Sequence, residues 1–299
     1  MLDFARAAAV STSKWCLGID LGGSSIKLAL VGSRCDPVTL GSREYRRPQL
    51  LQLGDCLGEA FDALCGSVAI KAASIGAACL SVPGPMDVNG VVTAASNLPA
   101  LVGLKVADWA QKQLHLCCRL SAISEPLAAA MGENRLRPCA GRALYLSIGS
   151  GVGGVVLEGG QPLGPAGHFG HIDVSGGEID APSGAGCGRG ALEAYIGAWS
   201  LRDAGVDLES PKRFEHLAMR RGVAALARAL RTLLMLYLPG RIVLLGGVGS
   251  SLGPALAQLN HLVRDGLGPA APRCFEIACG RSDRFGAALG TAWAAAAFR

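Results

Sequence analysis

The chain has 299 residues, a length that favours two domains and allows a large buried core. Half of the residues are hydrophobic and 17% are charged, which excludes an intrinsically disordered chain. The formal net charge is +5, but no run of Lys and Arg is long enough to predict a nucleic-acid-binding patch.

The eleven cysteines are scattered along the chain without a CxxC pair. Several lie in apolar, strand-like runs, where a thiol behaves as a small hydrophobic group. We therefore expect reduced thiols in a cytoplasmic protein rather than a framework of disulfides. The apolar run at residues 7–10 is too short for a signal peptide, and neither residues 223–238 nor residues 287–298 predict a membrane span.

The first predicted element is a β-hairpin. Apolar runs at residues 16–19 and 26–31 flank a turn that contains Asp20, two glycines and two serines. The backbone N–H groups of such a turn can bind an anion, and Asp20 at the strand end can hold a hydrated Mg²⁺. An ordinary hairpin with a solvated Asp20 is the alternative interpretation.

The rest of the first half predicts further strands and helices. In chain order they are a strand within residues 38–47, a helix over 50–67, a buried strand over 73–80, a short strand over 91–93, a helix over 106–114, a strand over 117–123 and a helix from 124. Two prolines make a rigid turn of residues 81–85, directly after the buried strand.

The second half repeats the opening of the chain. A strand over residues 143–148, a glycine turn over 149–154 and a returning strand over 155–157 follow one another. Two glycine turns in the same context, one in each half, predict two similar lobes that face one ligand. The remaining predicted elements are a long glycine-rich loop region over 159–190, a helix over 189–199, one or two helices over 211–238, a strand over 241–245, a helix over 252–267, a strand near 275–278 and a helix over 286–297.

Four motifs resemble those of the ROK family of sugar kinases, within the actin-like ATPase superfamily. They lie in the expected order at residues 20–27, 149–154, 166–171 and 246–249. The resemblance extends from Gly18 to about Ala296 and implies an α/β protein of two ribonuclease-H-like lobes, with mixed sheets flanked by helices and an active-site cleft between the lobes. ROK repressors carry a helix-turn-helix region before the first glycine turn. Only about nineteen residues precede Asp20 here, so a kinase is favoured over a repressor.

The resemblance also implies where the lobes divide. We expect an N-terminal lobe over residues 1–125 and a C-terminal lobe over residues 126–299, with the last helix packed back on the first lobe. Relatives are often dimers, so a homodimer is expected.

The nucleotide site implied by the resemblance consists of glycine turns from both lobes. Phosphoryl transfer needs backbone donors close to the phosphoryl oxygens, and glycines permit that approach. ATP and Mg²⁺ are the expected cofactors, with Asp20 holding the metal through water. The predicted nucleotide-binding residues are Asp20, Gly22, Gly23, Ser24, Lys27, Gly149, Ser150, Gly151, Gly153, Gly246 and Gly247.

The predicted catalytic residue is Glu125. Family members carry Asn-Asp at this strand end, with the Asp as general base for the sugar hydroxyl, and this chain has Ser124-Glu125. The longer side chain matters, because a misplacement of about 1 Å costs on the order of a hundredfold in rate. Either the acceptor is displaced to match, or activity is low or absent. A glutamate that only caps the helix start is the alternative.

The acceptor site is implied by matches to sugar-contacting positions. His168 resembles the residue of some bacterial N-acetylmannosamine kinases, which favours amino sugars. For His171, a core histidine bonded to a loop carbonyl is the alternative. The predicted substrate-binding residues are Gly84, Asn97, Ser124, Glu125, His168, His171 and Glu193.

Many relatives hold a structural zinc with three cysteines and the counterpart of His171. Residues 184–191 lack those cysteines, and Cys187 is out of register, so no zinc site is expected. We therefore expect ATP-dependent phosphorylation of a hydroxyl group on a hexose such as glucose, on an amino sugar such as N-acetylmannosamine, or on a sugar-like cyclitol. A catalytically silent relative that binds sugar or nucleotide is the alternative.

Overall fold

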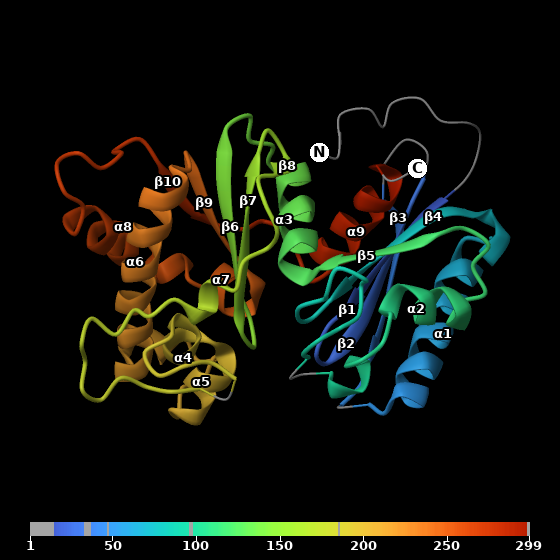
Figure 1. The fold of residues 1–299 in the computed structure, drawn as a ribbon, viewed down its shortest axis with the longest axis horizontal. Helices are drawn as coiled ribbons and strands as arrows, with labels where there is room; N and C mark the ends of the chain where they lie inside the picture. The colour runs from blue at the N-terminus through green and yellow to red at the C-terminus, as the bar shows by residue number, and fades with distance from the viewer. Residues whose placement is uncertain (1–14, 33–36, 47, 96–97, 185, 298–299) are drawn as a thin grey trace. The chain divides into compact units, whose positions relative to one another are not determined.

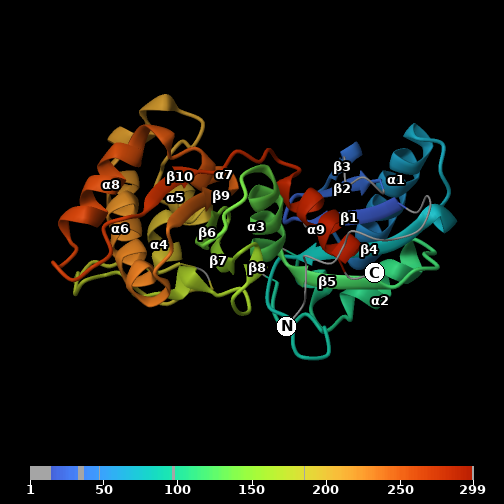
Figure 2. The same cartoon turned by 90° about the horizontal axis from the view of Figure 1, so that it is seen from above.

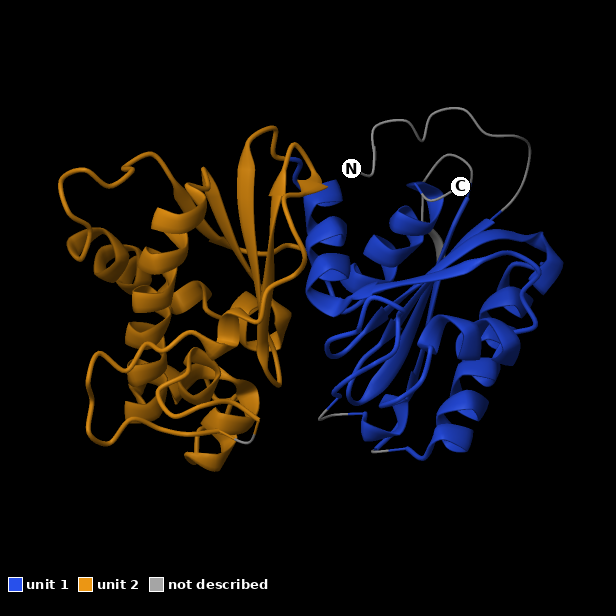
Figure 3. Cartoon of the chain, in the orientation of Figure 1, with its two compact units in different colours: residues 1–138, 282–299 blue, residues 139–281 orange. Residues whose placement is uncertain are grey.

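The chain forms two compact units in the computed structural model (Figure 3). The structure describes residues 15–32, 37–46, 48–95, 98–184 and 186–297. Unit 1 comprises the described residues up to 138 and from 282 onward, and unit 2 comprises residues 139–281. The division therefore falls after residue 138 rather than at the expected 125/126, because the helix that starts at Glu125 packs on the last helix of the chain.

Unit 1 is built around a mixed sheet with the strand order β3-β2-β1-β4-β5 (Figure 1). β1, β2 and β3 pair antiparallel, whereas β1, β4 and β5 pair parallel. The strands are β1 (Trp15–Leu21), β2 (Ser25–Val31), β3 (Pro37–Glu44), β4 (Ile75–Val82) and β5 (Leu120–Ser124). The helices are α1 (Leu50–Ser67), α2 (Val106–Gln113), α3 (Glu125–Leu136) and α9 (Gly286–Ala297), with 3₁₀ turns η2 (Ala72–Ser74) and η3 (Pro99–Leu101).

The alternation of side chains along β1 divides the core of unit 1 into two layers. Leu17 and Ile19 belong to the cluster that contains the buried face of α1, whose large apolar side chains recur every three or four residues. Cys16 belongs to the opposite cluster, which contains the alanines of α9. Figure 2 shows α9 beside β1 and β4.

Close packing of α9 on α3 depends on small residues. A Cβ atom added to Gly290 would lie 1.9 Å from the backbone oxygen of Ala128, so only glycine fits at this crossing. This approach explains why the glycine- and alanine-rich α9 is buried against the first half of the chain.

Unit 2 repeats the topology of unit 1 with the strand order β10-β9-β6-β7-β8. β6, β7 and β8 pair antiparallel, and β6, β9 and β10 pair parallel. The strands are β6 (Arg142–Ile148), β7 (Val152–Glu158), β8 (Gln161–Pro162), β9 (Arg241–Leu245) and β10 (Glu276–Cys279). The helices are α4 (Leu192–Ile196), α5 (Ala198–Asp203), α6 (Leu217–Tyr237), α7 (Gly246–Ser250) and α8 (Leu256–Asp265), with 3₁₀ turns η4 (Phe169–His171), η5 (Pro211–Glu215) and η6 (Gly253–Ala255).

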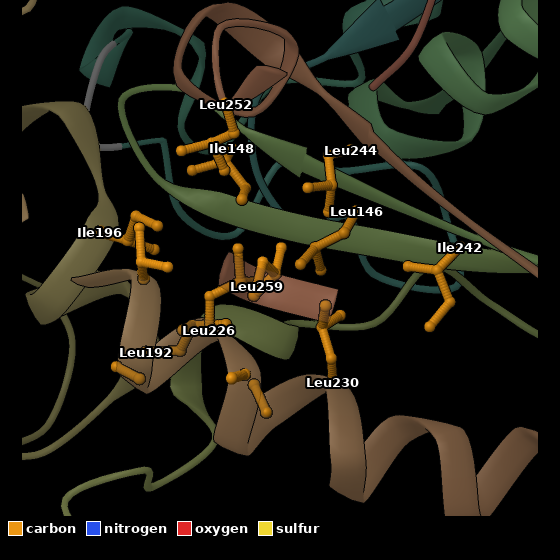
Figure 4. Packing of buried hydrophobic residues seen from close by; sticks show 14 of the residues in the cluster. Leu146, Ile148, Leu192, Ile196, Leu226, Leu230, Ile242, Leu244, Leu252 and Leu259 are labelled. Carbon is orange, nitrogen blue, oxygen red and sulfur yellow. The ribbon is translucent and has the colours of Figure 1, made fainter. Parts of the chain in front are cut away.

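A hydrophobic core in unit 2 joins one face of the sheet to α4, α6 and α8 (Figure 4). Alternate residues of β6 point into it, as expected for a strand that carries helices on that face. The labelled members of this core are Leu146, Ile148, Leu192, Ile196, Leu226, Leu230, Ile242, Leu244, Leu252 and Leu259. Two units of the same strand order, each a mixed sheet flanked by helices, confirm the predicted fold class.

Some predicted elements differ from the structure. The helix expected over residues 189–199 is divided into α4 and α5, because Gly197 is extended and Ala198 N–H donates to the carbonyl of Gly149 (2.8 Å). The strand expected over residues 91–93 consists of isolated bridges of Val91 and Val92. Within the described part of the chain, no helix combines the length and the apolar character that crossing a membrane requires.

Candidate active site

In unit 1, three parallel strands end at the same edge of the sheet. Asp20 of β1 is in register with Ser81 of β4, and Val82 of β4 is in register with Ser124 of β5. α3 begins at the next residue, Glu125. Because the carboxyl ends of parallel strands lie side by side, the sheet brings the two acidic residues of the predicted site to one edge.

Asp20 is the buried acid of this edge, with 4% of its surface exposed. Its Oδ1 accepts a hydrogen bond of 2.7 Å from the Ser81 hydroxyl, and its Oδ2 accepts one of 3.1 Å from the Lys27 ammonium group. Lys27 lies opposite Asp20 in the β1–β2 hairpin, so the register itself makes this ion pair. A buried carboxylate needs such partners, since an unpaired buried charge is costly.

This donor set fits a hydrated Mg²⁺. Magnesium prefers oxygen ligands and keeps several of its waters, and each oxygen of Asp20 accepts one protein hydrogen bond while retaining a second lone pair. Asp20 would therefore hold the ion through water, with Lys27 as its electrostatic neighbour.

Glu125 is the second acid at the same edge. It is half-buried, and its pKa is raised from 4.5 to about 7, first by burial and then by the negative charge of Asp20. The positive charge of Lys27 opposes this rise. A carboxylate with a pKa near neutrality is suited to accept a proton from a hydroxyl group.

Tyr45 is a neighbour of this edge that the sequence analysis did not single out. Its hydroxyl group donates to the carbonyl of Gly22, and its N–H donates to the carbonyl of Ser24 (2.9 Å). The pKa of Tyr45 is raised by burial and by the charges of Asp20, Cys56 and Glu125. Tyr45 directly follows β3, which pairs with β2, and this position is the one feature that could have indicated a contact with the glycine turn.

In unit 2, a glycine turn and the glycine-rich start of α7 lie next to each other at the ends of parallel strands. Ser147 of β6 is in register with Leu245 of β9; the turn that starts at Gly149 follows β6, and α7 follows β9 at Gly246. Gly246 has φ +78°, and a Cβ atom there would lie 2.5 Å from the oxygen of Ile148. Only glycine combines this backbone conformation with so close a contact, so the start of α7 reaches the end of β6 at Gly246.

Glu193 lies against the first of these turns. Its Oε2 accepts a hydrogen bond of 2.7 Å from the N–H of Val152, and a Cβ atom added to Gly151 would lie 2.7 Å from the same oxygen. The N–H of Gly149 donates to the carbonyl of Gly151 (2.9 Å). The turn is thus held by one hydrogen bond within it and by another to the side chain of Glu193, which was predicted to bind the acceptor.

The two predicted histidines lie together. His168 directly precedes the 3₁₀ turn η4 and His171 ends it; both side chains are exposed, and their rings meet edge to face with centroids 5.8 Å apart. The exposure of His171 is incompatible with the alternative of a core histidine. A pair of exposed imidazoles offers donors and acceptors to a polar ligand.

For the other predicted acceptor residues, the structure gives only their positions along the chain. Gly84 has φ +128° and follows β4, Ser124 ends β5, and Asn97 lies outside the described residues. In the segment predicted to lack zinc, Gly184 pairs with Cys187 in an isolated bridge. Across the described ranges, no three His, Cys, Asp or Glu side chains gather in a way that would hold a metal ion. The absence of zinc stays a prediction.

The structure thus assembles the predicted residues in two groups. Unit 1 brings Asp20, Lys27 and Glu125 to one strand edge, beside the turn of Gly22, Gly23 and Ser24. Unit 2 brings the turn of Gly149, Ser150, Gly151 and Gly153 beside Gly246 and Gly247, with Glu193 against it. The binding roles of these residues remain predictions.

Two units with this strand order, each with glycine turns at its strand ends, define a protein of the actin-like ATPase fold. The chain belongs to the ROK family, whose model matches residues 16–297. A kanosamine kinase from Amycolatopsis mediterranei is 27% identical to it over an alignment of 286 residues that covers 85% of this chain and 88% of that enzyme.

Further comparisons agree on the fold and the family. An N-acetylmannosamine kinase from Escherichia coli is 30% identical over 181 residues, which are 60% of each chain. The crystal structure of a ROK family glucokinase from Streptomyces griseus, in complex with glucose and AMPPNP, matches with a TM-score of 0.75. That match has 19% sequence identity and covers 94% of this chain and 99% of the glucokinase.

Proposed function

We propose that this protein is an ATP-dependent kinase that phosphorylates a hydroxyl group of a sugar or a sugar-like cyclitol. Membership of the ROK family and the kinase names of its relatives support the reaction class. Kanosamine and N-acetylmannosamine, for which two relatives are named, are amino sugars, so an amino sugar is the first acceptor to test. Glucose, bound in the Streptomyces griseus structure, is the second.

The observation that carries this proposal is the environment of Glu125. Burial and the negative charge of Asp20 raise the pKa of Glu125 to about 7, so this carboxylate can take up a proton near neutral pH. Glu125 is therefore proposed to accept the proton of the acceptor hydroxyl group. The oxygen of that hydroxyl group bonds to the γ-phosphorus of ATP, and the bond from this phosphorus to ADP breaks.

The remaining residues of unit 1 are proposed to bind and orient. Asp20 is fixed by Ser81 and Lys27, and it would hold Mg²⁺ through water. A bound Mg²⁺ supplies neutralisation of charge on the phosphate oxygens. The turn of Gly22, Gly23 and Ser24 would direct backbone N–H groups to a phosphate, and Ser124, Gly84 and Asn97 would border the acceptor.

The residues of unit 2 are proposed to bind the nucleotide and the sugar. The turn of Gly149, Ser150, Gly151 and Gly153, together with Gly246 and Gly247, is suited to phosphate because glycine permits close approach. His168 and His171 are proposed to contact the sugar ring, and Glu193 to contact the sugar or to support the turn that it already bonds.

The direct test is ADP release from ATP across a panel of kanosamine, N-acetylmannosamine, glucose and inositols. We expect one class to stimulate ADP release and Glu125→Gln to reduce kcat by at least about a hundredfold, the size of a general-base contribution. Sugar binding should stay near normal in that variant. Glu125→Asp is the matched control for side-chain length. If Glu125→Asp raises activity on glucose, the longer side chain lowers the activity of the family's catalytic base and is not adapted to a displaced acceptor.

A catalytically silent binding protein is the second candidate. The longer carboxylate at residue 125 and the Lys27 ammonium bonded to Asp20 favour it, because both alter the site that a metal and an acceptor would share. The kinase proposal fails if no acceptor stimulates ADP release while one of them still raises the melting temperature.

We also propose that the protein works in the cytoplasm as a homodimer. Thiols such as Cys79, which is fully buried with a pKa raised by burial, behave as core groups and suit a reducing compartment. Sedimentation of the purified chain under reducing conditions tests the assembly.

A further inference from the structure

The first glycine turn is held open by the side chain of Tyr45, which directly follows β3. Residues 23–24 form a bend rather than a hydrogen-bonded turn, and the N–H of Gly22 donates to the carbonyl of Ser25 (3.0 Å). In a tight hairpin of this length, the carbonyl of Gly22 would accept the return hydrogen bond from Ser25. Here that carbonyl accepts from the hydroxyl group of Tyr45.

Two peptide groups of the turn are oriented by Tyr45. A trans peptide is planar, so its N–H points opposite to its C=O. Because the Gly22 carbonyl is directed to the Tyr45 hydroxyl, the N–H of Gly23 points away from Tyr45. The Ser24 carbonyl accepts from the Tyr45 N–H, so the N–H of Ser25 points away as well.

The ring of Tyr45 is anchored well enough to do this. It packs against the hydrophobic cluster that contains β1, β2 and α1, so its hydroxyl does not move freely. Burial, and after it the charges of Asp20, Cys56 and Glu125, raise the pKa of this hydroxyl, so it remains a donor.

We propose that Tyr45 is a positioning residue for phosphate binding: its hydroxyl group holds the Gly22 carbonyl so that the N–H of Gly23 stays available to a phosphoryl oxygen of the nucleotide. This inference rests on the proposed function. Without the hydroxyl, the Gly22 carbonyl is free to take the hydrogen bond from Ser25, and the peptide between Gly22 and Gly23 rotates.

The test is Tyr45→Phe, which removes one oxygen atom and keeps the ring. Calorimetry measures binding of AMPPNP with Mg²⁺, and steady-state kinetics measure KM for ATP and for the best acceptor. We expect AMPPNP binding to weaken five- to tenfold, since one hydrogen bond is worth about 1 kcal/mol. KM for ATP should rise by the same factor, with KM for the acceptor unchanged within twofold. A general loss of structure would move both constants.

Tyr237→Phe, which removes a hydroxyl from a tyrosine of unit 2 outside the proposed machinery, is the control and should change neither constant. If Tyr45→Phe binds AMPPNP as tightly as the wild-type protein does, and the wild-type protein phosphorylates an acceptor, the inference is overturned and the proposed function stands. Weaker AMPPNP binding in a protein that phosphorylates no acceptor overturns the proposed function and supports the inference. A wild-type protein that binds no nucleotide overturns both.

Discussion

The Ser81 hydroxyl donates a hydrogen bond of 2.7 Å to the Asp20 carboxylate, from the strand next to β1 in the sheet. Both side chains are buried, and both lie at the carboxyl ends of parallel strands. The bond therefore fixes the acid that is proposed to hold the metal ion. Ser81 belongs to the rigid turn predicted from the sequence, where it had no assigned role.

Ser81→Ala should lower both stability and activity. The substitution leaves one buried carboxylate oxygen without its donor, which costs about 1–3 kcal/mol of unfolding free energy. It also frees Asp20 to rotate, so kcat should fall about tenfold. Urea unfolding and ADP-release kinetics measure the two effects. Ser121→Ala, on neighbouring β5, is the control with a partly exposed hydroxyl and a weaker bond to the Ala78 carbonyl; equal losses in both variants would show that Asp20 does not depend on Ser81.

Glu125→Gln should make the protein more stable at pH 8 but not at pH 5. The folded-state pKa of about 7 lies above the ordinary value of 4.5, so folding favours the protonated acid. Its contribution to stability is fully present below pH 4.5 and is lost as the pH rises through 7. The neutral amide avoids this loss, and we expect a gain on the order of 1–3 kcal/mol at pH 8.

Melting temperatures of the wild type and the variant at pH 5 and pH 8 measure this difference. Glu44→Gln, which neutralises an exposed side chain at the end of β3, is the control. If Glu125→Gln loses stability at pH 8, Glu125 is held as a carboxylate and the raised pKa is wrong.

Glu193 variants should distinguish support of the glycine turn from contact with a sugar. Glu193→Gln keeps an oxygen that accepts from Val152 N–H, whereas Glu193→Ala removes it. If the role is support, AMPPNP affinity should stay within about threefold in the first variant and fall at least about tenfold in the second, as expected for a lost hydrogen bond to a charged group. If both variants instead raise KM for the acceptor alone, Glu193 acts on the sugar.

Glu178 should stabilise the loop that precedes α4. Its carboxylate accepts hydrogen bonds from Arg221 (2.8 Å), Tyr195 (2.9 Å) and Arg228 (3.1 Å). The bonds from Arg221 and Tyr195, and then the positive charges of the two arginines, lower its pKa. A lowered pKa means that this stability is present above the ordinary value of 4.5 and is lost as the pH falls through the folded-state value. Because the side chain is about one-third exposed, Glu178→Gln should cost only about 1 kcal/mol, and less in high salt.

Urea unfolding of Glu178→Gln at pH 7 in low and high salt tests this network. Glu158→Gln, which removes a single exposed ion pair with Arg142, should cost less. A cost that does not change with salt would indicate that packing, and not charge, holds the loop.

Much of the fold could be predicted because its elements are long apolar patterns. The helix over residues 50–67, the strand over 241–245 and the last helix over 286–297 have the predicted bounds. The hairpin around Asp20 was predicted from two apolar runs and a glycine turn, which local sequence determines. Asp20 was predicted from a strand end next to a glycine turn, whereas Glu125 was predicted from its match to the Asn-Asp pair of the family.

Long-range partners could not be predicted. Ser81 reaches Asp20 only because β1 and β4 pair in one register, and Tyr45 reaches Gly22 only because β3 pairs with β2. Glu193 bonds Val152 from a separate helix. These contacts depend on strand register and on loop paths, for which no periodic pattern exists in the sequence.

The most direct test of the account is the pH dependence of kcat/KM for the acceptor that turns over fastest. The ionised form of Glu125 is the proposed base, so the rate should fall tenfold per pH unit below an apparent pKa of about 7. The residual rate of Glu125→Gln should show no such limb. A wild-type rate that stays flat from pH 5.5 to 8, or the same acid limb in Glu125→Gln, would contradict the assignment of Glu125 as the base.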